Sequence, residues 1–333
     1  RKADCQRALG NKKHYVPPQT HLQTASAAQA GCVAQQRTRF ERSRETPLLQ
    51  PLQKKEPMNI LLLGGSGFIG RRAARRLREA GHSVRTPPHA ELDLLRPDKA
   101  AAVPLLEGCG AVMNCVGIMS RHADILETVH HTTPALLAAW AKEAGVRRWV
   151  QLSALGADPA HAVAFLASKG RGDAAVAAEL DSATARPSVV YGRGGTSCEL
   201  FVKLARLPVL PLPAGGAFAL QPVHAEDVSD GLCRLLDAPS GAVVNMTGRL
   251  KTTLAAYLAI LRQTLHGKPP AKVLPVPLAL LRPALPPANI LSNGFLSRDS
   301  IRLLQQGSCA DCAGFAALLG REPLGADGFA RLP

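Results

Sequence analysis

A short apolar run that ends in a glycine-rich turn constrains this chain more than any other feature. Residues 60–63 read as a strand buried on both faces, because an apolar run without polar alternation is typical of parallel sheets. The run enters the turn Gly64-Gly65-Ser66-Gly67-Phe68-Ile69-Gly70, and a helical pattern follows. Gly64 permits a tight turn, Gly67 lets the backbone approach a pyrophosphate, and Gly70 allows the helix to pack closely against the strand. Because the helix start also presents free N–H groups to an anion, the whole stretch predicts a dinucleotide-binding turn.

The charge of the chain is basic but uneven. Of the net charge of +15, residues 1–57 carry +7, with eleven Lys or Arg against four Asp or Glu, and the remaining residues carry +8. Nucleic-acid binding would need this charge gathered on one face of a recognisable module, and the sequence contains none. No apolar run reaches the roughly 20 residues of a membrane span. We therefore expect neither a nucleic-acid partner nor a transmembrane segment.

The cysteines favour no metal site. There are 8 of them, scattered along the chain, and only Cys309 and Cys312 stand at a C-x-x-C spacing. A zinc site needs four ligands, and no second pair lies nearby. We therefore expect no metal and reduced, unpaired thiols.

The first 57 residues differ in composition from the rest. They are rich in Gln, Arg, Lys, Ala and Pro and have no sustained hydrophobic period. Three interpretations remain open: a disordered tail, an Arg-rich transit segment, or translated upstream sequence with Met58 as the true start, which we favour. We predict a disordered or non-native extension over 1–57, a dinucleotide-binding domain over 58–192, and a smaller C-terminal lobe over 193–333 that is partly interleaved with the core.

Apolar runs alternate with helical patterns after Met58. The runs cover residues 60–63, 83–86, 91–94, 111–117, 148–153 and 183–190. This alternation predicts an α/β fold of the Rossmann type, a doubly wound parallel sheet with helices on both faces. The arginines of the first helix, at positions 71, 72, 75, 76 and 78, predict a solvated helix face.

The end of the second strand bears on which cofactor is bound. An NAD-binding protein places an Asp or Glu there to hold the ribose 2′-hydroxyl, whereas this chain reads Val84-Arg85-Thr86-Pro87. Arg85 suits a 2′-phosphate, with help from Arg71 or Arg72. We therefore predict a preference for NADP(H), with NAD(H) as the alternative.

Two later segments complete the predicted cofactor cleft. Asp93, in the third run, is placed to reach the adenine edge. The fourth run ends in a turn of small residues that would line the cofactor: Asn114, Cys115, Val116 and Gly117.

These features match a known pattern over most of residues 58–250. Its members are the glycine turn, Asp93, Asn114-Cys115-Val116-Gly117, Ser153, Lys169, Arg186-Pro187-Ser188-Val189-Val190-Tyr191-Gly192 and Gln221-Pro222-Val223-His224-Ala225-Glu226-Asp227-Val228. They resemble the extended and atypical short-chain dehydrogenase/reductase superfamily, with its NAD(P)-dependent epimerases and dehydratases. The run Leu152-Ser153-Ala154-Leu155-Gly156-Ala157-Asp158 is most similar to a narrower group, the bacterial relatives of the NAD(P)H-binding accessory subunit of respiratory complex I. The resemblance implies that Lys169 and Pro187 also contact the cofactor.

The resemblance also exposes a gap in the catalytic set. Active members of the superfamily are similar in their catalytic residues. They use a serine together with a tyrosine that stands four residues before a lysine. Residues i and i+4 share a helix face, so the Lys ammonium lowers the pKa of the phenol that exchanges a proton with substrate. This chain matches at Ser153 and Lys169, but the tyrosine position holds Phe165. Acid–base help is worth roughly 10²–10⁴-fold in rate, so we expect the usual chemistry to be impaired.

Two other side chains are candidates to replace the tyrosine. His161 would share a face with Phe165 if the helix begins early enough, and a histidine can donate a proton near neutral pH. Pro159 precedes it, however, and proline favours the first turn of a helix, so a rim or capping position is the alternative. Ser153 either polarises a carbonyl unaided or bonds its own turn.

The cofactor-binding residues are therefore intact where the proton-transfer residues are not. We expect an NADP(H)-binding protein that acts as a cofactor-holding, stabilising or regulatory component, with a membrane respiratory complex as a partner. The alternative is an active NAD(P)H-dependent oxidoreductase, or a sugar-nucleotide epimerase- or dehydratase-like enzyme, with a different proton donor. The expected location is cytoplasmic or peripheral at the inner membrane, and mitochondrial only if residues 1–57 are a transit segment.

Overall fold

The computed structural model describes residues 56–281 and 298–331. The expectations for residues 1–57 therefore fall almost entirely outside the described residues. In the described part of the chain, no helix has both the length and the apolarity that crossing a bilayer requires.

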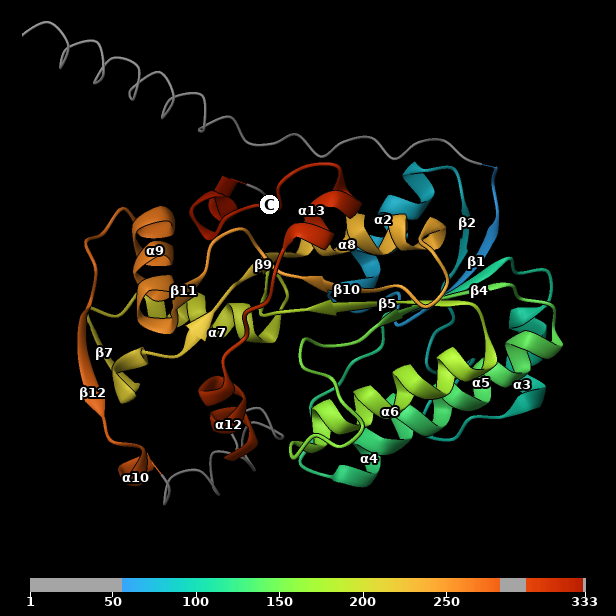
Figure 1. Ribbon diagram of the computed structural model, residues 1–333, viewed down its shortest axis with the longest axis horizontal. Helices are drawn as coiled ribbons and strands as arrows, with labels where there is room; N and C mark the ends of the chain where they lie inside the picture. The colour runs from blue at the N-terminus through green and yellow to red at the C-terminus, as the bar shows by residue number, and fades with distance from the viewer. Residues whose placement is uncertain (1–55, 282–297, 332–333) are drawn as a thin grey trace, which may run out of the picture. The chain divides into compact units, whose positions relative to one another are not determined.

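A parallel sheet of six strands forms the centre of the fold (Figure 1). Its strand order is β10-β5-β4-β3-β1-β2, and every neighbouring pair is parallel. The strands are β1 (Asn59–Leu63), β2 (Ser83–Arg85), β3 (Ala111–Asn114), β4 (Arg148–Leu152), β5 (Ser182–Pro187) and β10 (Val243–Met246). The predicted Rossmann-type α/β fold is confirmed.

Helices cover both faces of this sheet (Figure 1). One face carries α3 (Lys99–Leu106), α4 (Ala123–Glu127), the π-helical turn η1 (Thr128–Thr132), α5 (Thr133–Glu143) and α6 (Ala164–Glu179). The other carries α2 (Gly70–Glu79), α8 (Ala225–Arg234) and α13 (Ala313–Leu319). Alternate residues of β1 supply the two cores: Ile60 and Leu62 face α2 and α8, whereas Leu61 and Leu63 face α3 and α5. This is the period of two expected of a strand with both faces buried.

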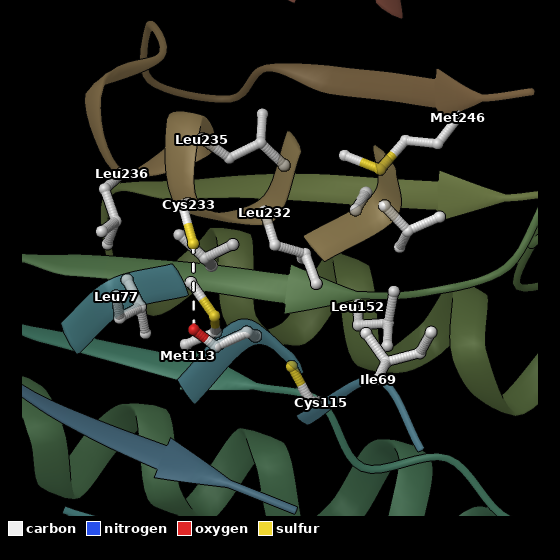
Figure 2. Close-up of a cluster of buried hydrophobic side chains, with 14 of the residues drawn as sticks. Ile69, Leu77, Met113, Cys115, Leu152, Leu232, Cys233, Leu235, Leu236 and Met246 are labelled. Atoms are coloured by element: carbon white, nitrogen blue, oxygen red, sulfur yellow. Dashed lines mark hydrogen bonds between the residues drawn. The ribbon is translucent and has the colours of Figure 1, made fainter. Parts of the chain in front are cut away.

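The core between the sheet and α8 is closely packed (Figure 2). Met113 of β3, Leu152 of β4 and Met246 of β10 meet Leu232 of α8 there. The Cys233 thiol lies 4.0 Å from the carbonyl oxygen of Ala73, its acceptor across the α2–α8 contact. This core holds the first and last strands of the sheet to the same pair of helices.

The remaining elements build a third core beyond the sheet. They are β6 (Val190–Tyr191), α7 (Thr196–Ala205), β7 (Val209–Pro213), η2 (Ala214–Gly216), β8 (Ala219–Leu220), β9 (Val223–His224), β11 (Thr252–Thr253), α9 (Leu254–His266), β12 (Lys272–Val276), α10 (Leu278–Leu281), α12 (Arg298–Gln306) and η4 (Ala326–Arg331). The turn η3 (Leu235–Asp237) follows α8 and belongs instead to the core between α8 and the sheet. Three two-stranded pairs, β6–β9, β8–β11 and β7–β12, hold this part together. It packs beside the C-terminal ends of β4 and β5, where a substrate would lie in an open α/β sheet.

Three strand predictions need correction. Residues 91–94 form turns, because Pro88 O accepts hydrogen bonds from the N–H groups of both Glu91 and Leu92. The sixth strand of the sheet is instead β10, which follows β5 only after a long excursion through other elements. The run at 183–190 is also split: β5 ends at Pro187, and Val190 pairs with Val223 of β9.

The prediction of a fully solvated arginine face on α2 was wrong at two positions. Arg72 Nε lies 3.2 Å from Glu226 Oε1, and Arg76 Nη2 lies 3.1 Å from Asp230 Oδ1. Arg72 and Arg76 are both buried, since α8 crosses this face and supplies carboxylates that the local sequence does not reveal.

Candidate functional site

The glycine turn between β1 and α2 is tight, and its glycines 64, 65 and 70 lie against neighbouring atoms. Gly64 has a φ of 72°, and Gly67 N donates to Gly64 O at 3.0 Å. A methyl group on Gly70 would lie 2.0 Å from Gly64 O, so only glycine fits where the helix begins. The first turn of α2 has no side-chain cap and no acidic residue. Its N–H groups and positive dipole end therefore favour an anion such as a pyrophosphate.

The end of β2 lies directly beside this turn. A methyl group on Gly65 would lie 2.4 Å from Thr86 Cγ2, so the end of β2 adjoins the glycine turn. The exposed guanidinium of Arg85 donates to Glu91 Oε1 at 2.7 Å and to Pro104 O at 3.1 Å. Arg85 therefore already has local partners, which a 2′-phosphate would have to share or displace.

Asp93 lies in a turn and is engaged locally. Its Oδ1 accepts from Leu95 N at 2.9 Å and lies 3.2 Å from His89 Nε2. The side chain thus caps its own turn in this structure.

The segment after β3 packs against the glycine turn. Asn114 Nδ2 donates to Gln151 Oε1 at 3.1 Å, and Asn114 Oδ1 accepts from Val116 N at 3.1 Å. Val116 lies against Gly64. Cys115 is buried, which raises the pKa of its thiol to about 12, so the thiol stays protonated. The structure therefore brings the segment 114–117 into contact with the glycine turn.

Lys169 joins two strand ends from its position on α6. Its Nζ donates to Val116 O at 2.8 Å and to Leu152 O at 3.0 Å, and the side chain is 2% exposed. Burial lowers the pKa of this ammonium to about 8, partly offset by the Asp173 carboxylate. Position 117 is also close, since a methyl group on Gly117 would lie 3.6 Å from Nζ. The Lys169 ammonium is thus fixed between residues 116–117 and the end of β4.

Ser153 is bonded to a carboxylate that the sequence did not single out. Its Oγ donates to Asp173 Oδ2 at 2.7 Å, and Arg186 Nη2 donates to the same oxygen at 3.1 Å. Burial raises the pKa of Asp173, while Ser153 and Arg186 lower it. With its proton held by Asp173, Ser153 offers lone pairs rather than a donor to a substrate. The available sequence signal was the position of Asp173, four residues after Lys169 on one helix face.

His130 is a second buried group that sequence reasoning missed. It lies in η1, where Nε2 accepts from Ile118 N at 3.1 Å and Nδ1 lies 3.1 Å from Ser168 Oγ. Burial, with Lys169 adding to it, lowers the pKa of His130 to about 2. The ring is therefore a neutral imidazole that links the backbone at Ile118 to Ser168 of α6. No local sequence pattern predicts this role.

This neutral histidine makes stability sensitive to acid. An unfolded histidine titrates near 6.5, so stability is fully present above that pH and is lost as pH falls toward the folded value. The loss is about 1.4 kcal/mol per pH unit. Between pH 6.5 and pH 5, the wild type should therefore lose roughly 2 kcal/mol more of its unfolding free energy than a His130→Gln variant. Urea denaturation at each pH measures this; equal losses would contradict a buried neutral His130.

Phe165 lies one turn before Lys169 on α6 and faces a cavity of about 890 Å³. Arg186 and Pro187 of β5 line the same cavity, as do Ala154 and Leu155 after β4, but Ser153 does not. The Phe165 ring meets His130 edge-on, with 5.5 Å between ring centroids. No other aromatic hydroxyl compensates within the described residues. Tyr191 and Tyr257 are both buried in the third core and do not line this cavity.

His161 also lines the cavity but lies before the helix. The first residue of α6 is Ala164, so His161 does not share a helical face with Phe165. Its Nδ1 accepts from Val163 N at 2.9 Å, which leaves Nε2 as the ring nitrogen for any ligand. Predicting this position required knowing where the helix begins, which the Asp158-Pro159 sequence left open.

The comparisons with known proteins agree with this geometry. The family model for the NAD dependent epimerase/dehydratase family matches residues 60–247. The chain belongs to this family. The match covers the glycine turn, Lys169 and the last strand of the sheet, and it confirms the resemblance to the extended short-chain dehydrogenase/reductases.

Curated relatives match at low identity. Subunit 9 of the mitochondrial NADH dehydrogenase [ubiquinone] 1 alpha subcomplex is 27% identical in Arabidopsis thaliana, over 53% of this chain and 49% of that protein. Its counterpart in Rattus norvegicus is 26% identical, over 54% and 53%. The ceramide reductase of Caulobacter vibrioides is 28% identical, over 56% of this chain and 64% of that protein. The chain thus spans about half the length of the two subunits.

Solved structures share the fold. The dTDP-glucose 4,6-dehydratase DesIV of Streptomyces venezuelae, with NAD bound, has a TM-score of 0.61 at 21% identity, covering 82% of this chain and 96% of that one. The dTDP-4-dehydrorhamnose reductase of Bacillus anthracis, in complex with NADP, has a TM-score of 0.58 at 11% identity, covering 67% and 86%. Within this fold, therefore, both nicotinamide dinucleotides are bound. Among the described residues of this chain, no cluster of His, Cys, Asp and Glu could hold a metal ion.

Proposed function

We propose that this chain binds NADP(H) and holds it without the tyrosine-dependent proton transfer of active relatives, as a stabilising or regulatory component. The observation that carries the proposal is Phe165, which lies one turn before the buried Lys169 and lines the cavity beside it. The chain thus retains the residues proposed to bind the cofactor, but position 165 lacks the phenol that would transfer a proton.

The residues of the cleft fit a dinucleotide. The close packing around Gly64 and Gly70, beside an uncapped helix start, supports a pyrophosphate cradle that larger residues would fill. Gly65, Ser66, Gly67, Phe68 and Ile69 complete this cradle. Arg85 and Asp93 would lie toward the adenine half, with Asn114, Cys115, Val116, Gly117, Lys169 and Pro187 toward the nicotinamide half. A bound nicotinamide would supply or accept the hydride.

The remaining groups replace the phenol poorly. Ser153 already donates to Asp173, and His130 is neutral with both ring nitrogens engaged. Lys169 donates to two backbone carbonyls, so its use is to hold the ribose and the strand ends. General acid–base catalysis contributes roughly 10²–10⁴-fold in rate, and we infer that this contribution is missing here.

A basic side chain at the adenine end favours NADP(H) over NAD(H). The end of β2 carries Arg85 beside the glycine turn, and residues 84–87 include no carboxylate to bond a ribose 2′-hydroxyl; the carboxylate nearby, Glu91, pairs with Arg85 itself. The likeness to two mitochondrial NADH dehydrogenase subunits supports a partner in a membrane respiratory complex, and with it a location in the cytoplasm or at the inner membrane surface. A mitochondrial location would require residues 1–57 to be a transit segment.

A working reductase with another proton donor is the second candidate. Two observations favour it: His161 lines the cavity together with Phe165, and one relative is named as a ceramide reductase. This candidate requires His161, rather than a residue on α6, to protonate the substrate.

Titration of the full chain with NADPH and NADH, followed by fluorescence, tests the proposal. NADPH should bind more tightly, and neither should be consumed in air or with a quinone. Phe165→Tyr should raise consumption with a carbonyl or quinone acceptor on the order of 10²-fold. Its new phenol, one turn from the Lys169 ammonium, should titrate below the ordinary pKa of about 10.

Phe201→Tyr is the matched control, because Phe201 lines the same cavity from α7 instead of α6. It places a phenol on α7 rather than one turn before Lys169, so it should not raise consumption and should leave cofactor affinity unchanged. Consumption by the wild type that disappears in His161→Gln would replace the proposal with the second candidate. No binding of either nucleotide would overturn both.

A further inference from the structure

The cavity beside Phe165 has a mainly apolar lining. It lies at the C-terminal ends of β4 and β5, and side chains from α6, α7 and α12 line it. Its apolar members include half-buried side chains from six separate segments: Met119, Leu155, Phe165, Val189, Leu200, Phe201, Leu303 and Leu304. A volume of about 890 Å³ is within the usual range of ligand pockets, roughly 300–1,000 Å³. Contiguous apolar surface of this kind gains free energy when an apolar ligand covers it.

The lining offers little for a phosphate group. Among the described residues that line the cavity there is no carboxylate and no lysine, and Arg186 carries the one permanent charge. That guanidinium is already bonded to Asp173. The start of α7 reaches the cavity at Ser197, but Glu199 in its first turn places a negative charge at that end. A sugar nucleotide would bring a diphosphate that needs cationic or N–H partners, and this lining supplies them poorly.

The polar groups suit a small uncharged head. Asn245 of β10 lines the cavity and is exposed, and in the described chain its amide makes no side-chain hydrogen bond. An amide both donates and accepts, so it matches a carbonyl or a hydroxyl equally well. The opposite wall is α12, an amphipathic helix in which no residue is fully buried, with Leu303 and Leu304 turned toward the cavity.

We propose that this cavity binds a long apolar chain that carries one uncharged carbonyl or hydroxyl head. The head lies at Asn245, and the chain covers the apolar side chains of α7 and α12. The inference rests on the proposed function, because it assigns a ligand to the pocket beside the proposed cofactor cleft. It departs from a nucleotide-sugar ligand because the lining lacks a partner for a diphosphate.

A chain-length series of methyl ketones tests this directly. The full chain is loaded with Nile red, whose fluorescence reports an apolar site, and 2-hexanone, 2-nonanone and 2-dodecanone are added as competitors. Each added methylene should tighten binding about fourfold until the cavity is filled, because burying one methylene is worth about 0.8 kcal/mol. UDP-glucose should not compete. Competition by UDP-glucose, or affinity that is independent of chain length, would overturn the proposal.

Variants locate the site. Leu303→Asp should weaken 2-dodecanone binding on the order of 100-fold or more, because it places a charge against the chain. Gln305→Asp on the exposed side of the same helix is the control and should change nothing. If Leu303→Asp does not fold, Leu200→Trp serves instead and should shorten the longest ketone accepted. Unchanged binding in a folded variant would contradict the assignment to this cavity.

NADPH is titrated in the same samples, which separates the two proposals. Ketone binding without NADPH binding would contradict the proposed function but would still support the apolar ligand site. NADPH binding without ketone binding would contradict the apolar ligand site alone.

Discussion

Gly70→Ala is expected to lower nicotinamide dinucleotide affinity on the order of 100-fold or more, because the phosphate-binding turn cannot keep its shape. The added methyl group would lie 2.0 Å from Gly64 O and 2.8 Å from Gly64 C, both of which are backbone atoms. Backbone cannot rotate away as a side chain can, so the turn must shift and its N–H groups lose their aim at the pyrophosphate. Overpacking of a close contact also costs about 1–3 kcal/mol of stability.

Fluorescence titration with NADPH measures the affinity, and urea denaturation measures the stability. Gly314→Ala is the matched control, since a methyl group on that helical glycine meets no atom within 4 Å. It should keep full affinity and should be slightly more stable, as alanine restricts the unfolded chain. Retention of NADPH affinity by folded Gly70→Ala would show that the cofactor does not use this turn.

The parts of the fold that depend on local pattern could be predicted from the sequence. The strands β1 and β4 are short apolar runs, and the turn after β1 needs glycine for reasons that act within seven residues. The strand β10 could not be found this way. It has four residues, three of them not fully buried, and its place in the sheet depends on β5, which lies far earlier in the chain.

The same distinction applies to the candidate site. The spacing of Phe165 and Lys169 lies within one helical turn, so the sequence alone predicted an aromatic ring without a hydroxyl one turn before the lysine. The bond between Ser153 and Asp173 joins a strand end to a helix, and its direction decides whether Ser153 can donate to a substrate. His130 reaches Ile118 through a π-helical turn, a local irregularity that propensity does not predict.

The solvent exposure of charged residues on helices was the least reliable prediction from the sequence. A run of arginines on α2 is normally a solvated face, yet α8 brings Glu226 and Asp230 over it. The same helix carries Asp227, which is fully buried and faces the C-terminal segment. The buried carboxylates of α8 thus form ion pairs that hold distant segments together. Removal of one of these carboxylates should lower the free energy of unfolding substantially.

Asp227→Ala is expected to destabilise the fold by about 3–5 kcal/mol, because it leaves a buried arginine without its partner. Asp227 Oδ1 accepts from Arg321 Nη2 at 2.6 Å, and Oδ2 accepts from Leu324 N at 2.7 Å. The side chains of Asp227 and Arg321 are 0% and 8% exposed. Asp230 Oδ2 lies 3.9 Å from Arg321 Nη2, beyond hydrogen-bond distance, and Asp230 Oδ1 is held by Arg76, so Asp230 replaces Asp227 poorly.

Asp327→Ala provides the contrast, since it removes a similar pair at the surface. Asp327 Oδ2 lies 3.0 Å from Arg249 Nη2, with side chains 57% and 49% exposed. Solvent screens such a pair, so its loss should cost less than about 1 kcal/mol. Urea denaturation of the two variants at pH 7 should therefore separate them by at least about 2 kcal/mol. Equal and small losses would mean that the segment 321–324 is held by apolar packing of Leu324 in the third core rather than by Asp227.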